Sequence, residues 1–337
     1  MLLQRMAGPH SNGRGSPDSK PEAGPEIGGN MGRAGKGPFL KRGMMVTALL
    51  FAAAGGADAG DVTAQGQSPS AQDKSRYTLF NPTPDSLLRD LSTDRPDMTE
   101  SPFTVDAGHL QIETNIFGYS RSRPDQDSTV TKSYDYATTN FRIGLTNWAE
   151  FNVVLQPYGV IKTRPLDPAE ATRNSGIGGV DLRVKINLWG NDTFESPGAT
   201  AFGLLPFVTL ATDRDNGISP TGTEGGLIVP FAMKLTDKFS LGVNGGLHVV
   251  RNEDEPGTHT EWLSSASISY EWTENLSTYY EIAGRFGTRD PRGDIGILAT
   301  GFTYKLSKNV QLDGGINFGV TNAADRINPF VGISARF

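Results

Sequence analysis

Apolar and polar side chains alternate with a period of two along the chain from about residue 108 onward. In residues 180–188 every even position is apolar, whereas the odd positions carry Asp181, Arg183, Lys185 and Asn187. Alternation of this kind predicts a β-strand with one apolar face and one hydrated face.

The same pattern recurs in twelve segments. They cover residues 108–120, 134–146, 149–161, 178–189, 198–211, 225–236, 239–250, 260–272, 276–286, 294–306, 309–320 and 328–337. Segment 198–211 is apolar on both faces and fits the pattern least well. The sequence therefore predicts an all-β fold.

The links between these segments alternate in length. The short links are 147–148, 236–238, 273–275 and 307–308, with 190–197 intermediate, and the long ones are 121–133, 162–177, 212–224, 251–259, 287–293 and 321–327. An even number of strands of about ten residues, with short turns at one end and long loops at the other, is typical of a transmembrane antiparallel up-and-down β-barrel of the outer membrane. Twelve strands place both ends of the barrel domain on the short-turn side, which we expect to be periplasmic.

Two further features agree with a barrel surrounded by outer-membrane lipid. Trp148, Trp189 and Trp272 lie beside short links, where an aromatic girdle is expected. Apolar residues also occupy alternate positions from Val331 to the final Phe337, and this pattern is similar to the signal that the barrel-assembly machinery recognises.

The cost of exposing charge to lipid determines which face of each strand points inward. A Lys or Arg facing lipid at the bilayer midplane costs about 2–4 kcal/mol, so the charged faces should line the lumen. The lumen-lining candidates are Glu113, Arg142, Glu150, Asp181, Arg183, Lys185, Glu281, Arg285 and Asp313. These groups either select solutes by charge or only neutralise one another. A soluble β-sandwich would use the same apolar set, but it explains neither the N-terminus nor the alternating loops.

The N-terminal region predicts export. Lys41 and Arg42 precede a short apolar run at 44–54, and small residues follow, as in a secretory signal peptide. We expect cleavage after Ala59, with Ala64 as the second choice.

The domain organisation follows from this leader. We predict an N-terminal extension plus signal peptide over 1–59, with an ordinary start at Met31, a periplasmic arm over 60–107, and the barrel over 108–337. The alternative for the apolar run is a buried helix or a membrane anchor.

Composition and short motifs argue against several classes of function. The chain of 337 residues has no Cys and a net charge of −6, which argues against disulfides, thiolate metal sites and nucleic-acid binding. Residues 213–217 resemble a calcium loop, but the glycine is misplaced and no distal Glu completes it. No phosphate loop, zinc motif or dinucleotide fingerprint is found, so we expect neither cofactor nor metal.

Several motifs resemble those of a known family. They are TDRPDMTESP at 93–102, GGVDLRVKINLWGND at 178–192 and EGGLIVP at 224–230, with shorter matches at 259–262 and 328–332. In these motifs the chain is similar to the phenol-degradation meta-pathway family of outer-membrane barrel proteins, which are labelled transporters. The resemblance covers about 92–337 and implies transport of small organic molecules.

Residues 93–102 are also candidates for a plug or gate. They carry Asp94, Arg95, Asp97 and Glu100, and two prolines keep the segment extended. One hypothesis is that this segment folds into the barrel mouth, with Arg95 meeting lumen carboxylates. The alternative is a periplasmic lead-in to the first strand.

These observations predict a channel that passes small, aromatic or organic-acid solutes by diffusion through a charged lumen, and we expect a monomer. The runner-up is a non-conducting barrel with a structural or surface-interaction role. An outer-membrane esterase or phospholipase would need a Ser–His pair. No motif places a serine beside His109, His248 or His259, so no catalytic residue is predicted.

Overall fold

The computed structural model describes residues 73–125, 127–252 and 255–337. The predicted leader, both cleavage sites and Met31 lie outside the described residues. The described residues contain fourteen strands and two short 3-10 helices, η2 (Asp85–Leu87) and η3 (Pro168–Glu170). None of these helices is long and apolar enough to cross a membrane.

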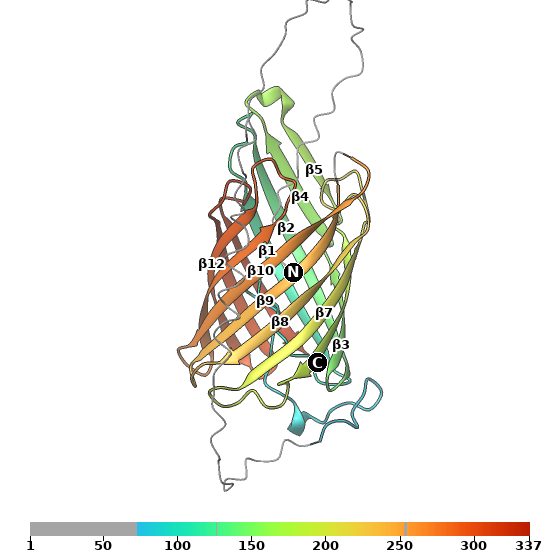
Figure 1. The fold of residues 1–337 in the computed structure, drawn as a ribbon, viewed down its shortest axis with the longest axis vertical. Coiled ribbons are helices and arrows are strands. Elements are labelled where there is room, and N and C mark those ends of the chain that lie inside the picture. Colours follow the sequence, from blue (N-terminus) through green and yellow to red (C-terminus); the bar gives the residue numbers. More distant parts are fainter. Residues whose placement is uncertain (1–72, 126, 253–254) are drawn as a thin grey trace, which may run out of the picture. The chain divides into compact units, whose positions relative to one another are not determined.

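All fourteen strands belong to one sheet (Figure 1). They are β1 (Leu110–Arg121), β2 (Val130–Thr146), β3 (Ala149–Leu155), β4 (Tyr158–Arg164), β5 (Thr172–Gly176), β6 (Val180–Trp189), β7 (Thr200–Leu210), β8 (Glu224–Lys234), β9 (Phe239–Arg251), β10 (Thr258–Glu271), β11 (Leu276–Phe286), β12 (Ile295–Ser307), β13 (Val310–Gly319) and β14 (Asn328–Arg336).

The sheet closes on itself because β1 pairs antiparallel with both β2 and β14. β2 pairs with β3 and then with β4, while β3 pairs with β6 and β4 with β5. Thus β3 and β4 form one barrel strand interrupted at 156–157, and β5 and β6 form another interrupted at 177–179. Pro157 cannot donate to the ladder, which explains the first interruption. The prediction of a closed antiparallel barrel of twelve strands is confirmed.

Side chains follow the predicted alternation along each strand. Apolar residues such as Ile116, Leu188 and Ile282 are exposed on the outside, whereas Arg142 and Lys185 are fully buried inside. An exposed apolar band around a polar interior is the arrangement that lipid requires.

Strand β7 departs from this pattern, as its sequence indicates. Its inward-facing Leu205 and Phe207 pack with Ile228 of β8 and Leu263 of β10 in an apolar cluster. One part of the barrel interior is therefore filled by apolar rather than charged side chains.

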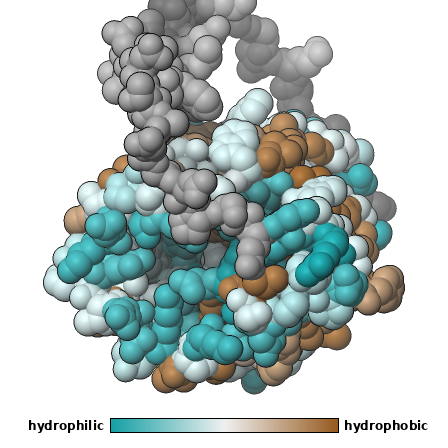
Figure 2. Space-filling view, turned by 90° about the horizontal axis from the view of Figure 1, so that it is seen from below, coloured by the Kyte–Doolittle hydropathy of each residue, from teal (hydrophilic) through white to brown (hydrophobic). Residues whose placement is uncertain are grey.

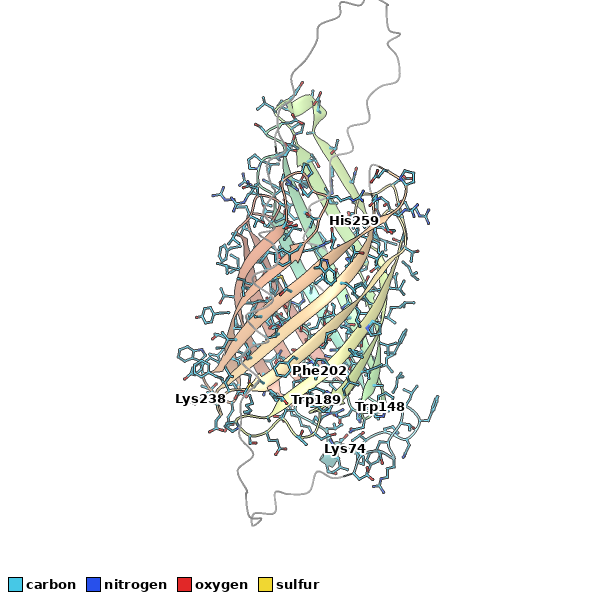
Figure 3. All side chains as sticks on the ribbon, in the orientation of Figure 1. Lys74, Trp148, Trp189, Phe202, Lys238 and His259 are labelled. Carbon is cyan, nitrogen blue, oxygen red and sulfur yellow. The ribbon has the colours of Figure 1, made fainter. Side chains whose placement is uncertain are left out.

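The short links and the long loops lie at opposite ends of the barrel (Figure 1). Trp148, Trp189 and Phe202 lie at a similar level near the short-link end (Figure 3). The rings of Trp189 and Phe202 stack with centroids 4.8 Å apart. Figure 2 views this end directly and shows hydrophilic residues gathered across it, with hydrophobic residues mostly at its edge. The level at which Trp148, Trp189 and Phe202 lie is the position of an interfacial aromatic belt.

Candidate functional site

Residues 92–106, which we call the inner segment, belong to the predicted arm over 60–107 but run inside the barrel before β1, so the name arm is kept below for the residues that precede them. Asp94, Glu100 and Asp106 are all less than 7% exposed. The segment makes polar side-chain contacts with β1, β2, β3, β6, β10, β11 and β13. It therefore crosses the lumen and contacts wall strands on both sides.

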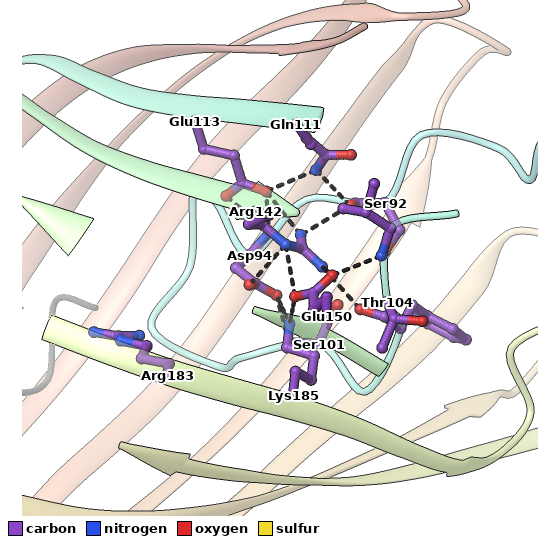
Figure 4. A network of polar contacts seen from close by, with 12 residues as sticks. Ser92, Asp94, Ser101, Thr104, Gln111, Glu113, Arg142, Glu150, Arg183 and Lys185 are labelled. Atoms are coloured by element: carbon purple, nitrogen blue, oxygen red, sulfur yellow. Dashed lines mark hydrogen bonds and ion pairs between the residues drawn. The ribbon is translucent and has the colours of Figure 1, made fainter. Parts of the chain in front are cut away.

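Arg142 of β2 is the centre of a network of buried polar contacts (Figure 4). Its guanidinium makes two hydrogen bonds to Glu150, of 2.9 and 3.0 Å, and one of 2.8 Å to Glu113. It also donates to the carbonyls of Ser92 and Phe103, at 3.1 and 2.8 Å. One side chain thus holds both ends of the loop that the inner segment makes.

Asp94 attaches the segment to the same network. Its carboxylate pairs with the Lys185 ammonium and lies 3.4 Å from Nε of Arg142. Its backbone N–H donates to both carboxylate oxygens of Glu113, at 3.2 and 3.1 Å. All these side chains are almost fully buried, so each charge needs its partners to offset the loss of its hydration.

The middle of the segment contacts the opposite wall. The Arg95 guanidinium donates two hydrogen bonds to Asp313 of β13, at 2.7 and 3.2 Å. The backbone N–H of Met98 and the hydroxyl of Thr99 donate to Glu281 of β11, at 2.9 and 2.6 Å. Paired donors of this kind fix geometry as well as charge.

The segment then returns to its starting side. Glu100 pairs at 2.9 Å with Arg183, which also binds Asp181 at 2.7 Å. The amide of Asn187 donates to the Pro102 carbonyl at 2.9 Å, and the Val105 N–H donates to Glu150 at 2.6 Å. The chain leaves the lumen here and enters β1.

All nine sequence-predicted lumen residues are buried inside the barrel, and seven of them contact the inner segment directly. Asp181 joins through Arg183, whereas Arg285 pairs with Glu261 instead. Of the four plug candidates, Asp94, Arg95 and Glu100 each pair with the wall, and Asp97 lines a cavity described below.

Sequence reasoning missed several members of these networks. The Ser265 hydroxyl accepts a hydrogen bond from Thr99 at 2.8 Å, and the Glu261 carboxylate contacts both Arg285 and His259. Their inward position follows from the alternation, but these partnerships depend on which strands lie across from one another. The described residues include no group of three or more His, Asp or Glu that could hold a metal ion.

A second ionic cluster anchors the arm at the short-link end. Lys74 pairs with Asp192 at 2.7 Å, and Arg89 pairs with Asp106 at 3.2 Å and with Asp192 at 3.5 Å. Asp192 belongs to the link between β6 and β7, outside the spanning strands. These pairs connect residues before the inner segment to Asp106 at its end and to the end of the barrel wall.

This anchor should weaken in acid. Partial burial raises the pKa of Asp192, but hydrogen bonds from Lys74 and Asn147 outweigh burial and hold this pKa below its ordinary value. A lowered folded-state pKa gives stability that is present above the ordinary value and is lost as the pH falls through the folded value. Pepsin should therefore cleave the arm around 73–91 faster as the pH falls below about 4, the ordinary range of a carboxyl group. In Asp192→Asn this pH dependence should flatten, and an unchanged profile would contradict the assignment.

Comparisons with known proteins agree with this architecture. The sequence model of the family described as "Putative MetA-pathway of phenol degradation" matches residues 93–337. No curated protein matches the chain. Among solved structures, the COG4313 outer membrane channel from Pseudomonas putida F1 is similar, with 13% identity and a TM-score of 0.56 over 73% of this chain and all of that one.

Two further barrels have lower similarity. The NanC porin shares 12% identity at a TM-score of 0.41, over 67% of this chain and 98% of that one. The CymD monoaromatic hydrocarbon channel shares 9% identity at a TM-score of 0.34, over 68% and 87%. The structural likeness establishes the outer-membrane barrel fold, and the family match begins within the inner segment and includes every barrel strand. The chain belongs to the MetA-pathway of phenol degradation family.

Proposed function

We propose that this protein is an outer-membrane channel for small solutes and that the inner segment is its gate. The observation that carries the proposal is the position of residues 92–106 across the lumen, bonded to seven strands of the wall. A barrel of twelve strands lies between filled eight-stranded barrels and open sixteen-stranded porins. A segment that fills such a lumen through reversible polar contacts is suited to regulate passage.

The remaining assignments form one proposal. Residues 1–59 export the chain, the short links and both ends of the barrel domain face the periplasm, and the alternation up to Phe337 serves recognition by the assembly machinery. The protein works as a monomer in lipid. The family description names phenol degradation, which supports small aromatic molecules as solutes, whereas organic acids are proposed from the charged lumen alone.

Hydrolysis has no comparable support. Among the described residues, His109 and His259 hydrogen-bond to carbonyl or carboxylate oxygens, and His248 lies 3.4 Å from Glu224. No serine hydroxyl bonds to any of these three rings in the part of the chain that the structure describes. We therefore assign passage of solutes rather than catalysis to the barrel.

A reversible disulfide between the inner segment and the wall tests the gate. Thr99 Oγ1 and Ser265 Oγ lie 2.8 Å apart, so cysteines at both positions are within reach of a disulfide. In planar bilayers the Thr99→Cys, Ser265→Cys double variant should lose its channel openings when oxidised and regain them on reduction. The natural chain has no cysteine, so it should not respond to either reagent.

The control variants carry Thr99→Cys or Ser265→Cys alone. Openings that are identical in oxidised and reduced double variant would refute gating by this segment. Absence of openings in every variant, including one that lacks residues 60–107, would refute the channel and favour a non-conducting structural barrel.

A further inference from the structure

A cavity of about 260 Å³ lies between the inner segment and the wall made by β8 to β12. The inner segment contributes Asp97 and Phe103 to its lining, and the link between β6 and β7 contributes Phe194. The wall side carries mainly small hydroxyl side chains, which we call the hydroxyl wall: Ser240, Ser267, Ser269, Ser277 and Thr303. Several of these residues lie near strand ends at the short links, so the cavity is at that end of the barrel.

The cations that hold the inner segment lie on other strands than the hydroxyl wall. The cations Arg142, Arg183 and Lys185 lie on β2 and β6, where they bind carboxylates of the inner segment and the adjacent wall. Arg95 lines the cavity, but its guanidinium is bonded to Asp313. Seven of the nine charged residues that the sequence places in the lumen contact the inner segment, and this cavity lies beside the hydroxyl wall.

Asp97 gives this cavity a negative character. Among the described residues neither Asp97 nor the neighbouring Glu281 forms an ion pair with Lys or Arg. The Glu281 carboxylate accepts hydrogen bonds from the backbone of Met98 and the hydroxyl of Thr99, whereas the Asp97 carboxylate is hydrogen-bonded to Ser267 of the hydroxyl wall and lines the cavity. A carboxylate without a paired cation attracts positive charge and hydrogen-bond donors and repels anions.

Aromatic side chains also line the cavity or lie against it. Tyr279 lines the cavity and is 4% exposed, yet its hydroxyl has no hydrogen-bond partner among the described residues. A buried hydroxyl without a protein partner takes its hydrogen bond from water or from a bound molecule. The edge-to-face rings of Phe103 and Phe194, with centroids 5.0 Å apart, add an apolar surface to the same cavity.

We propose that this cavity is a solute-binding subsite that takes small ring compounds bearing a hydrogen-bond donor, and that Asp97 makes it prefer cationic and uncharged forms to anions. The proposal rests on the channel function and narrows it, because it places the path of the solute along the hydroxyl wall rather than along the charged strands. Carboxylate and hydroxyl groups would bind the donor, and the two phenylalanine rings would contact the ring of the solute.

Thiol chemistry tests the subsite without requiring any current. The chain has no cysteine, so Ser269→Cys introduces a single thiol into the hydroxyl wall. In detergent micelles a cationic methanethiosulfonate should modify this thiol at least about tenfold faster than an anionic one of similar size, because Asp97 attracts the first and repels the second. Adding Asp97→Asn should reduce this ratio by about threefold or more, because the substitution removes the negative charge that Asp97 contributes to the cavity.

The matched control is Asp237→Asn, which removes an exposed carboxylate at the same end of the barrel, in the link between β8 and β9. It should leave the ratio unchanged. Equal rates for the two reagents, or an equal effect of Asp97→Asn and Asp237→Asn, would overturn the role of Asp97.

Protection against an uncharged thiosulfonate then defines the ligand. Benzylamine and benzyl alcohol should slow modification of Ser269→Cys, and benzoate, which has the same ring and a negative charge, should not. Equal protection by all three, or by none, would overturn the subsite. Channel openings without selective protection would leave the channel function intact and refute only this subsite, whereas protection without openings would refute only the channel.

Discussion

Replacing Arg142 with methionine should lower the free energy of unfolding of the barrel by about 3–5 kcal/mol, the usual effect of removing one partner from a buried ionic network. The guanidinium is fully buried and bonds to Glu113, Glu150 and the backbone at both ends of the inner segment. Methionine fills much of the same volume but leaves these carboxylates without their main cation. The inner segment should also lose its fixed position.

Urea unfolding in detergent micelles, followed by tryptophan fluorescence, measures the stability change. The matched control is Arg289→Met, which removes an exposed arginine paired with Glu255 in the long loops and should change stability little. Equal effects of the two substitutions would contradict the central role of Arg142. Arg142→Lys should recover part of the loss, because it keeps the charge but not the forked geometry.

Substituting Gly144 with alanine should displace the end of the inner segment and open the channel. A Cβ at this position of β2 would lie 2.1 Å from the carbonyl oxygen of Asp106 and 2.8 Å from that of Val105. Both are backbone atoms, so the segment must move away from the wall. Overpacking of this kind costs about 1–3 kcal/mol, and here the strain falls on the attachment of the gate.

Single-channel recording should show a higher open probability for Gly144→Ala than for the natural chain. Proteolysis should also cut residues 92–106 more readily, because a displaced segment exposes its backbone. The control is Gly245→Ala on β9, where an added Cβ meets no atom within 4 Å. An unchanged open probability with an intact barrel would argue that the inner segment does not gate.

Much of the barrel follows from local sequence. The alternation in residues 180–188 fixes the two faces of β6, because turning the strand over would expose Arg183 and Lys185 to lipid. The short links were placed within a few residues, since each lies between two strongly alternating segments. These predictions succeeded because lipid imposes the same rule on every strand.

The sequence predicts the wall near β4 and β5 less well than the rest of the barrel. Residues 162–177 were predicted to be a long loop, but the structure pairs β4 with β5 here and extends the wall by a hairpin. The segment is polar and mostly exposed, so it lacks the alternation that identifies a strand inside the membrane. Both strand interruptions lie next to this hairpin.

The sequence by itself determined the class of the fold, the number of barrel strands and the set of charges that point inward, because a two-residue period and the cost of charge in lipid act on each strand separately. Only the tertiary structure decided which of these charged side chains form ion pairs with one another. Arg95 and Asp313 are 218 positions apart and become partners through the closure and stagger of the barrel. The same closure directs the cations of β2 and β6 to the inner segment and leaves the cavity beside the hydroxyl wall, since the inner segment fills only part of the space that twelve strands enclose.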